Sequence, residues 1–214
     1  VLSQDGYYFI EPGSGYLACG YVAKGRMEEP MQILSVINKF FTQQKNVVKS
    51  SFSGKRALVT AGPTVEVIDP VRYVSNRSSG KMGYAIAEAL RDKGAIVTLI
   101  SGPTHLSLPE GINVVKVESA DDMFQAVTER FAKQDIVIKA AAVSDYTPMD
   151  ILEHKLKKQE GGLSVQFKRT KDILKYLGEN KTHQYLVGFA AETQNIEQYA
   201  LDKLKRKNAD VIIS

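Results

Sequence analysis

Short apolar runs alternate with amphipathic stretches from residue 56 to the end of the chain. Runs in which almost every residue is apolar are typical of strands buried on both faces of a sheet. We predict strands at residues 56–61, 95–100, 113–117, 135–140, 184–190 and 210–213, and helices at residues 82–93, 123–133, 171–177 and 196–207. This alternation predicts an α/β fold: a doubly wound, mostly parallel, Rossmann-like sheet flanked by helices.

The first part of the chain lacks this rhythm. Glycine and aromatic residues dominate residues 1–30 and follow no helical period, which predicts a loop or hairpin. Pro30 precedes an amphipathic stretch that predicts a helix at residues 31–41. Residues 42–54 are polar and are typical of a linker. We therefore expect an N-terminal appendage (residues 1–41), a linker (42–54) and one α/β domain (55–214).

Composition narrows the classes of function. The formal charge of +4 suits an anionic small substrate but is too small and too scattered to indicate nucleic-acid binding. One cysteine excludes a disulfide framework. No apolar run reaches the roughly 18 residues that span a membrane, and the first residues do not resemble a signal peptide. We expect a cytoplasmic enzyme.

The long loop after the first strand concentrates candidate chemistry. Before the next helix the chain brings together Arg72, Asn76, Ser78, Ser79, Gly80 and Lys81. Free N–H groups at the start of a helix suit a phosphate, although Ser78 or Ser79 could simply be an N-cap. The loop does not read G-x-G-x-x-G, and the second strand ends in Ser101-Gly102 without an acidic residue for a ribose. An NAD(P)-binding Rossmann protein is therefore the less favoured alternative.

Six motifs stand in order along residues 55–214: Thr60-Ala-Gly-Pro-Thr64, Asp69-Pro-Val-Arg72, Ser75-Asn76-Arg-Ser78-Ser79-Gly80-Lys81, Ala140-Ala-Ala-Val-Ser-Asp145-Tyr146, Lys155-Leu-Lys157-Lys158 and Gly188-Phe189-Ala-Ala-Glu192. Together they closely resemble phosphopantothenoylcysteine synthetase, the ligase half of bacterial bifunctional coenzyme A biosynthesis proteins. The resemblance implies that the carboxylate of 4′-phosphopantothenate attacks the α-phosphate of CTP, which gives an acyl-cytidylate and pyrophosphate. L-cysteine then attacks the acyl carbon and CMP leaves. The resemblance also implies Mg²⁺, whose ligands the sequence does not identify, and leaves open a strict preference for CTP over ATP.

The resemblance assigns roles to particular residues. Asn76 would hold the acyl region, and Lys155 would act in the second half-reaction from a mobile flap. The implied nucleotide contacts are Ala141, Asp145, Lys155, Lys158 and Phe189, with Glu192 as an alternative metal or ribose contact. The implied substrate and phosphate contacts are Arg72, Ser78, Ser79, Gly80 and Lys81. Simpler interpretations stay open: Asn76 could stabilise its own turn, the lysines could be a solvated charge run, and Ala141 and Phe189 could be packing residues.

The front segment around Cys19 resembles the end of phosphopantothenoylcysteine decarboxylase, the flavoprotein usually fused ahead of this ligase. There Cys19 would be the proton donor, but only in the parent protein, because the FMN-binding body is absent here. The chain by itself is predicted to have no decarboxylase activity. The family also implies a homodimer through the ligase domain, and a domain that normally continues beyond the last strand, so we expect a C-terminal truncation. A non-catalytic fragment is the remaining alternative.

Overall fold

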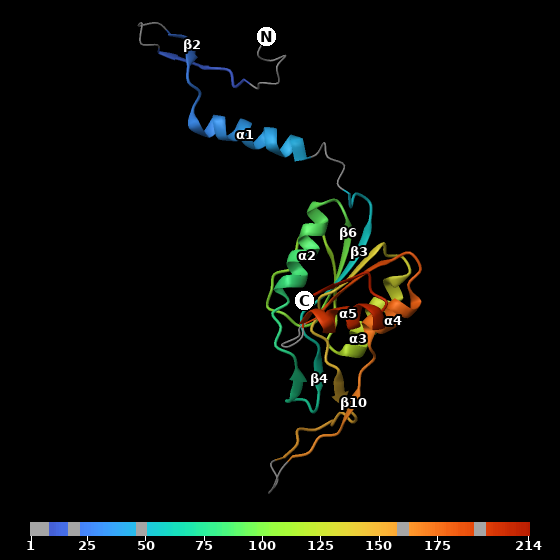
Figure 1. Cartoon of the computed structure of the whole chain (residues 1–214). Coiled ribbons are helices and arrows are strands. Elements are labelled where there is room, and N and C mark those ends of the chain that lie inside the picture. Colours follow the sequence, from blue (N-terminus) through green and yellow to red (C-terminus); the bar gives the residue numbers. More distant parts are fainter. Residues whose placement is uncertain (1–8, 17–21, 46–50, 158–162, 191–195) are drawn as a thin grey trace. The chain divides into compact units, whose positions relative to one another are not determined.

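The computed structural model describes residues 9–16, 22–45, 51–157, 163–190 and 196–214, in two compact units, Val1–Lys49 and Ser50–Ser214 (Figure 1). In the first unit, β1 (Gly13–Tyr16) pairs antiparallel with β2 (Val22–Arg26). The helix α1 (Pro30–Lys45) follows and continues four residues past the predicted end at residue 41. Met31, Leu34 and Ile37 on this helix are exposed.

The second unit is built around a six-stranded sheet in which every neighbouring pair is parallel. Its strands are β3 (Arg56–Ala61), β6 (Ile96–Ser101), β7 (Asn113–Lys116), β8 (Ile136–Lys139), β11 (Tyr185–Phe189) and β12 (Val211–Ile213). The spatial order is β12-β11-β8-β3-β6-β7, which confirms the doubly wound, Rossmann-like prediction. The strand order reverses between β3 and β8, where ligands bind in such sheets.

Helices cover both faces of this sheet. On one face, α2 (Lys81–Asp92) packs on a core that includes Val59 and Leu99. On the other, α3 (Ala120–Phe131) and α4 (Ile173–Asn180) pack on a core that includes Leu58 and Ile100. The helix α5 (Ile196–Arg206) packs against β12. The described part of the chain contains no helix that is long and apolar enough to cross a membrane.

The unit begins slightly before residue 55, within the stretch that we predicted to be a linker. Phe52 packs against the core on the α2 face. The N–H of Gly54 donates a hydrogen bond of 3.2 Å to the carbonyl of Gly94. The turn at residues 51–54 is thus part of the α/β unit, because it covers the amino end of β3.

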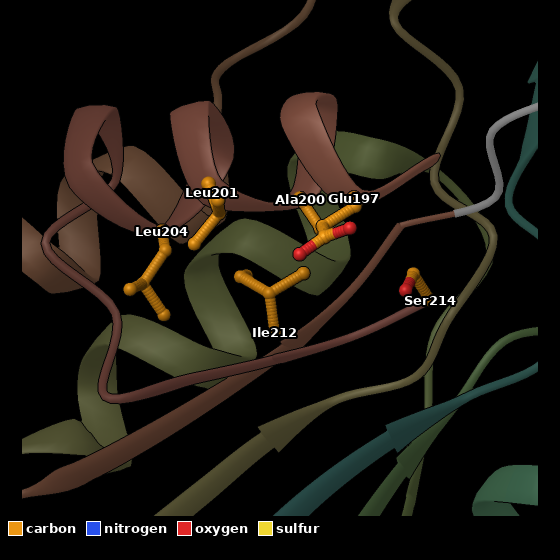
Figure 2. Close-up of a pocket in the computed structure, with 6 residues that line it drawn as sticks. All are labelled: Glu197, Ala200, Leu201, Leu204, Ile212 and Ser214. Atoms are coloured by element: carbon orange, nitrogen blue, oxygen red, sulfur yellow. The ribbon is translucent and has the colours of Figure 1, made fainter. Parts of the chain in front are cut away.

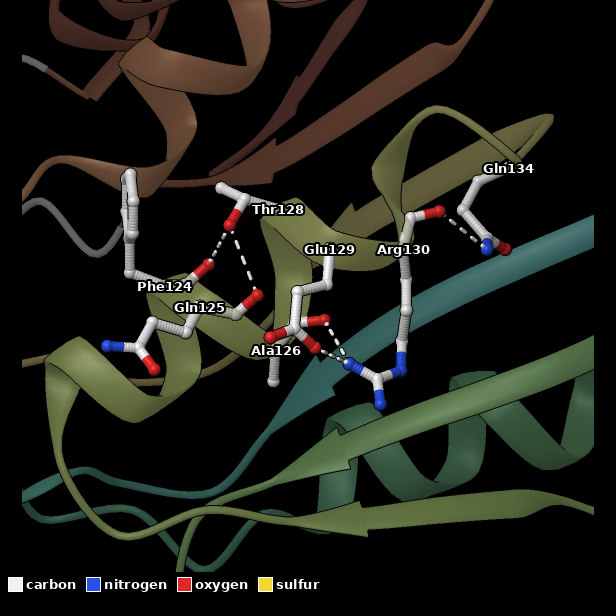
Figure 3. A network of polar contacts seen from close by, with 7 residues as sticks. All are labelled: Phe124, Gln125, Ala126, Thr128, Glu129, Arg130 and Gln134. Atoms are coloured by element: carbon white, nitrogen blue, oxygen red, sulfur yellow. Dashed lines mark hydrogen bonds and ion pairs between the residues drawn. The ribbon is translucent and has the colours of Figure 1, made fainter.

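A side-chain capping box sets the start of α3. The Ser119 hydroxyl accepts a hydrogen bond from the N–H of Asp122, and the Asp122 carboxylate accepts one from the N–H of Ser119. This capping box confirms the sequence pattern and starts the helix three residues earlier than predicted. In Figure 3, Thr128, Arg130 and Gln134 donate hydrogen bonds to carbonyls of the same helix. The carbonyls of Phe124 and Ala126 lie within the helix, and that of Arg130 also accepts the N–H of Lys133 over 3.2 Å, so these side-chain bonds add to the backbone hydrogen bonds of the helix.

Two antiparallel hairpins project from the carboxyl edge of the sheet, side by side (Figure 1). The first arm (residues 65–75) is β4 (Val65–Val67) paired with β5 (Tyr73–Ser75). The second arm (residues 146–169, described except for 158–162) contains β9 (Tyr146–Pro148) paired with β10 (Phe167–Arg169). The prediction of a plain loop at residues 65–78 was therefore wrong. Strands of three residues are too short for a two-residue alternation to stand out.

Candidate functional site

The segments that follow β3 and β8 stay together beyond the ends of the two strands. The N–H of Ala142 donates to the carbonyl of Gly62 over 2.9 Å, and the N–H of Thr64 donates to the carbonyl of Ala142 over 3.3 Å. Thr64 is buried, and its hydroxyl accepts a hydrogen bond of 3.0 Å from the N–H of Ser144. This is the switch in strand order, where sheets of this kind bind ligands, and for that position we call it the crevice: the carboxyl edge between β3 and β8, with residues 62–64, 76–81 and 141–145.

Three glycines, Gly62, Gly80 and Gly83, lie where α2 meets the end of β3 beside the crevice, and we call them the glycine wall. Gly62 and Gly80 both have positive φ angles, of 74° and 77°. A Cβ atom on Gly80 would lie 3.3 Å from the nitrogen of Gly62, and one on Gly83 would lie 2.5 Å from the Cβ of Ala61. The turn at Gly62 and the close packing of α2 against β3 at Gly83 are the geometry that glycines supply in a dinucleotide-binding loop. The first arm is inserted between the first two glycines, so the sequence shows only the tail of the pattern, Gly80-Lys81-Met82-Gly83, which by itself is weak evidence.

The N-terminus of α2 is open toward an anion. Gly80 is the N-cap, and no side chain makes a capping hydrogen bond there. Ser79 accepts from the N–H of Lys81 at 3.5 Å and Ser78 from the N–H of Gly80 at 3.4 Å, both at the limit of hydrogen bonding. The alternative that Ser78 or Ser79 caps the helix was therefore wrong. First-turn amides and the exposed Lys81 suit a phosphate.

Asn76 is anchored across the crevice. Its Nδ2 donates hydrogen bonds to the carbonyls of Ala142 and Val143, at 3.3 and 3.1 Å. These bonds cross to the segment after β8, which argues against the alternative that Asn76 stabilises its own turn. Its Oδ1 has no hydrogen-bond partner within the described ranges. Asn76 therefore presents an acceptor to the crevice from a fixed position.

Asp145 lies on the same segment as the carbonyls that Asn76 contacts. Its side chain is exposed, and its backbone carbonyl accepts a hydrogen bond of 3.0 Å from Thr170. Ala141 donates its N–H to the Thr60 hydroxyl over 3.2 Å and also packs against the core on the α3 face. The structure thus brings Asn76, Asp145 and the start of α2 together. Ala141 can pack against the core and still let a ligand approach its backbone, because its side chain is small.

Arg72 and Lys155 lie on the arms instead. One guanidinium nitrogen of Arg72 donates a hydrogen bond of 2.8 Å to the carbonyl of Leu156. Another lies 3.7 Å from the carboxylate of buried Asp69, which also accepts the N–H groups of Val71 and Arg72 at 2.8 Å. Within one chain, Arg72 therefore joins the two arms and does not line the crevice. Lys155, next to Leu156, is exposed.

Asp69 is charged at the centre of this joint. Burial by itself would raise the pKa of Asp69, but the backbone N–H groups that it accepts, including that of Leu156, outweigh burial. The positive charge of Arg72 adds to their effect, so the pKa of Asp69 lies below its ordinary value. An ionised Asp69 fixes the end of the first arm and the neighbouring stretch of the second.

Phe189 is half-buried at the end of β11, and its carbonyl accepts a hydrogen bond of 2.8 Å from Lys203. It lies at the same edge of the sheet as the crevice, because β11 is the parallel neighbour of β8. The predicted site residues Cys19, Lys158 and Glu192 lie outside the described residues.

A buried lysine at this edge was not singled out from the sequence. Lys139 ends β8 on the α3 face, and its Nζ lies 3.9 Å from the sulfur of Met123. Burial lowers the pKa of Lys139 to about 7, against an opposing effect of Asp172. A lysine that ends an otherwise apolar run was the available signal.

A separate groove of about 310 Å³ lies between α5 and β12 (Figure 2). Leu201, Leu204 and Ile212 form most of its wall, with Glu197 and Ser214 at one end. It lies at the outer edge of the sheet, and β11 and β8 separate β12 from the crevice. The groove contributes no group to the crevice.

Comparison with known proteins by sequence and by structure points to one family. Residues 52–214 match the family described as the DNA/pantothenate metabolism flavoprotein C-terminal domain. The chain is 55% identical to the coenzyme A biosynthesis bifunctional protein CoaBC of Bacillus subtilis, over 100% of this chain and 52% of that protein. It is 48% identical to the protein of the same name from Haemophilus influenzae, over 99% of this chain and 52% of that protein.

A solved C-terminal domain of a coenzyme A biosynthesis bifunctional protein CoaBC has the same fold. It superposes with a TM-score of 0.69 at 52% identity, over 76% of this chain and 78% of that one. The chain spans about half the length of the curated relatives that it matches. With residues 52–214 matched and identity near one half, the chain belongs to the DNA/pantothenate metabolism flavoprotein C-terminal domain family.

Proposed function

We propose that the α/β unit is a ligase of coenzyme A biosynthesis that joins 4′-phosphopantothenate to L-cysteine at the expense of CTP. The observation that supports this most is Asn76, held across the crevice by the carbonyls of Ala142 and Val143, beside a helix N-terminus without a side-chain cap. The names of the bacterial relatives, which are coenzyme A biosynthesis proteins, support the same pathway.

The proposed chemistry explains why such a crevice is needed. A carboxylate acylates an amine only after one of its oxygens becomes part of a good leaving group. The substrate carboxylate attacks the α-phosphorus of CTP, pyrophosphate leaves, and an acyl-cytidylate remains. The amine of cysteine then attacks the acyl carbon, CMP leaves, and the amine loses a proton. Fixed cations and N–H donors offset the repulsion between the carboxylate and the triphosphate.

Each described residue of the crevice has a role in this proposal. The first-turn amides of α2, with Ser78, Ser79, Gly80 and Lys81, hold phosphate groups. The Asn76 side chain holds the acyl group. Its Nδ2 is bound to the carbonyls of Ala142 and Val143, so its Oδ1 is the atom that faces the substrate. Ala141, Asp145 and Phe189 form the nucleotide side of the site.

Mg²⁺ fits this arrangement through Asp145. Within the described ranges, no group of three or more His, Cys, Asp or Glu side chains could hold a metal ion. Magnesium in nucleotide sites is usually held by one or two carboxylates together with substrate phosphates and water. Asp145 would supply the carboxylate, and the ion would offset negative charge on the triphosphate.

Lys155 and Lys158 enter the proposal through the second arm. A segment of the arm that closes over the triphosphate would bring their charges to the nucleotide, and Lys155 would act in the second half-reaction. Arg72 would position that segment through Leu156, and a phosphate contact by Arg72 would come from a second subunit.

A homodimer through the arms is part of the proposal. The two arms expose several large apolar side chains: Val71, Tyr73, Val74, Tyr146, Met149, Ile151, Leu152, Leu163 and Phe167. An apolar surface of this kind is typical of a protein–protein interface. A second copy of the chain would bury it and bring the arms of one subunit toward the crevice of the other.

The first unit would be the end of a decarboxylase domain in the parent protein. In that setting Cys19 would be the proton donor and FMN the cofactor. The exposed apolar side chains of α1, such as Leu34 and Ile37, support packing against a further domain. Consumption of CTP and cysteine is compatible with the cytoplasm.

The decisive experiment separates the two half-reactions. The protein with CTP, Mg²⁺ and 4′-phosphopantothenate should release pyrophosphate, and CMP should appear only after L-cysteine is added. We expect Asn76→Ala to reduce turnover by at least about a hundredfold, the range for loss of a fixed transition-state contact. Lys155→Gln should block CMP release more than pyrophosphate release. Asn113→Ala and Lys133→Gln, both at exposed positions away from the crevice, are the matched controls.

Absence of pyrophosphate release by a folded wild-type protein would overturn the proposal and favour a non-catalytic fragment. Thermal unfolding addresses the dinucleotide alternative, because a ligand that binds the folded state raises the melting temperature. Stabilisation by NADPH without stabilisation by CTP would favour that alternative.

A further inference from the structure

A second cavity, of about 670 Å³, opens on the other side of the glycine wall, at the carboxyl ends of β6 and β7. Thr104 forms the partition between this cavity and the crevice. Its Cγ2 lies so close to Gly62 and Gly80 that a Cβ atom on either would approach it to 2.9 or 2.8 Å. A molecule in the cavity would therefore lie beside the N-terminus of α2, next to the proposed phosphate site.

The charged groups of this cavity come from the end of β7 and the start of α3: Lys116, Glu118 and Asp122. Lys116 and Glu118 are exposed, and neither forms an ion pair within the described part of the chain. The N–H of Ser119, the strongest influence on Asp122, helps to lower the pKa of that carboxyl despite some burial. The cavity thus offers one cation and two carboxylates.

The rest of the lining is neutral. The Tyr84 hydroxyl lies 3.1 Å from the hydroxyl of Ser101 and 3.2 Å from that of Thr104. Leu106 and Leu108 form an apolar wall. The cavity can therefore accommodate a small side chain and a few polar atoms without offering a further charge.

This distribution of charge selects among the three reactants of the proposed ligase. CTP and 4′-phosphopantothenate carry several negative charges and no positive one, so two carboxylates disfavour them. A free amino acid carries an ammonium group, which suits Glu118 and Asp122, and a carboxylate, which suits Lys116. The thiol of cysteine is small and weakly polar, which suits the leucine wall.

We propose that this cavity is the binding site for the free amino acid that accepts the acyl group, L-cysteine. The inference rests on the proposed ligase function and adds a location and a recognition pattern for its third substrate. In this proposal CTP and phosphopantothenate occupy the crevice, and the amino acid approaches the acyl carbon of the acyl-cytidylate from the side of Thr104, whose side chain has to move for the two to meet.

The test compares L-cysteine with cysteamine, which lacks the α-carboxylate that Lys116 would bind. Lys116→Met should raise the KM for cysteine about tenfold, the effect of losing one charge-assisted hydrogen bond, and should leave the KM for cysteamine unchanged. Pyrophosphate release from CTP and phosphopantothenate without any amine should also stay unchanged. Glu118→Gln should raise the KM for both amines, because both carry the ammonium group. Lys133→Met and Glu88→Gln are exposed matched controls.

An unchanged KM for cysteine in Lys116→Met, an equal rise for cysteamine, or a loss of pyrophosphate release would overturn this assignment. If the wild-type protein releases no pyrophosphate at all, the ligase proposal fails on its own. Calorimetric titration with L-cysteine then decides about the cavity: binding by wild type that Lys116→Met abolishes supports an amino-acid site, and absence of binding to wild type overturns it.

Discussion

The guanidinium of Arg72 donates a hydrogen bond of 2.8 Å to the carbonyl of Leu156, the residue that follows Lys155. In the opposite direction, the N–H of Leu156 donates to the Asp69 carboxylate over 3.2 Å. The turn of the first arm therefore determines where a stretch of the second arm lies. Residues more than 80 positions apart in the sequence form one joint, and the proposed catalytic lysine is attached to it.

Loosening this joint should affect Lys155 without unfolding the α/β core. In Arg72→Met, we expect faster hydrogen exchange at the Leu156 amide and slower CMP release, by about tenfold, the effect of one hydrogen bond to a charged group. Hydrogen-exchange mass spectrometry and the two-stage assay measure the two effects. Arg206→Met, at the exposed end of α5, is the control. Unchanged exchange at Leu156 would show that the arms are held together by other contacts.

The glycine wall predicts a difference between two glycines with the same backbone conformation. Gly80 and Gly54 have φ angles of 77° and 76°, but a Cβ atom meets nothing within 4 Å at Gly54 and meets Thr104 and Gly62 at Gly80. Gly54→Ala should cost about 1–2 kcal/mol of unfolding free energy through backbone strain alone. Gly80→Ala should cost about 1–3 kcal/mol more, because the neighbours must move.

Urea unfolding of the two variants isolates the packing contribution, because the strain is common to both. Equal losses of stability in the two variants would mean that Thr104 and Gly62 move away from the added methyl group without a measurable cost. Protection by CTP provides a second measurement: it should survive in Gly54→Ala and weaken in Gly80→Ala, whose added methyl group crowds the proposed phosphate site.

The apolar side chains of the arms predict the state of association. Wild type should sediment at twice the chain mass of 23.6 kDa, whereas Tyr73→Asp combined with Phe167→Asp should sediment as a monomer. Both side chains are exposed on the arms, so a charge there opposes burial in an interface without disturbing the core. Tyr185→Asp is the matched control, because Tyr185 is exposed at the amino end of β11. A dimer that persists in the double variant would place the interface elsewhere.

The sequence predicted the sheet well because parallel strands buried on both faces leave long apolar runs, as in Arg56–Ala61. It could not predict the arms, whose strands have three residues each and depend on Asp69, Arg72 and Leu156 meeting in space. Only Gly80 and Gly83 of the glycine wall could be recognised in the sequence, because an inserted hairpin separates Gly62 from Gly80. The family resemblance identified Asn76 and Asp145 as site residues, and the structure brings both to one crevice. It did not predict that Arg72 joins the two arms.

Lys139 predicts a pH dependence of stability that a single variant can isolate. Burial lowers its pKa from 10.5 to about 7 in the folded chain, although Asp172 opposes this effect. Between these two pKa values the unfolded state keeps a proton that the folded state has lost, so the stability of wild type rises with pH. Below the lower value both states are protonated, and the destabilisation by the buried charge is greatest.

Lys139→Met keeps an unbranched side chain in the same space and removes the charge. The variant should therefore be more stable than wild type near pH 7, with an advantage that shrinks by up to about 1.4 kcal/mol for each pH unit toward pH 10. Urea unfolding of both proteins across this range measures the difference, in which the other titrating groups cancel. The exposed Lys133→Met should show no such trend. A difference that stays flat from pH 7 to 10 would mean that Lys139 remains charged in the folded protein, with Asp172 compensating for burial.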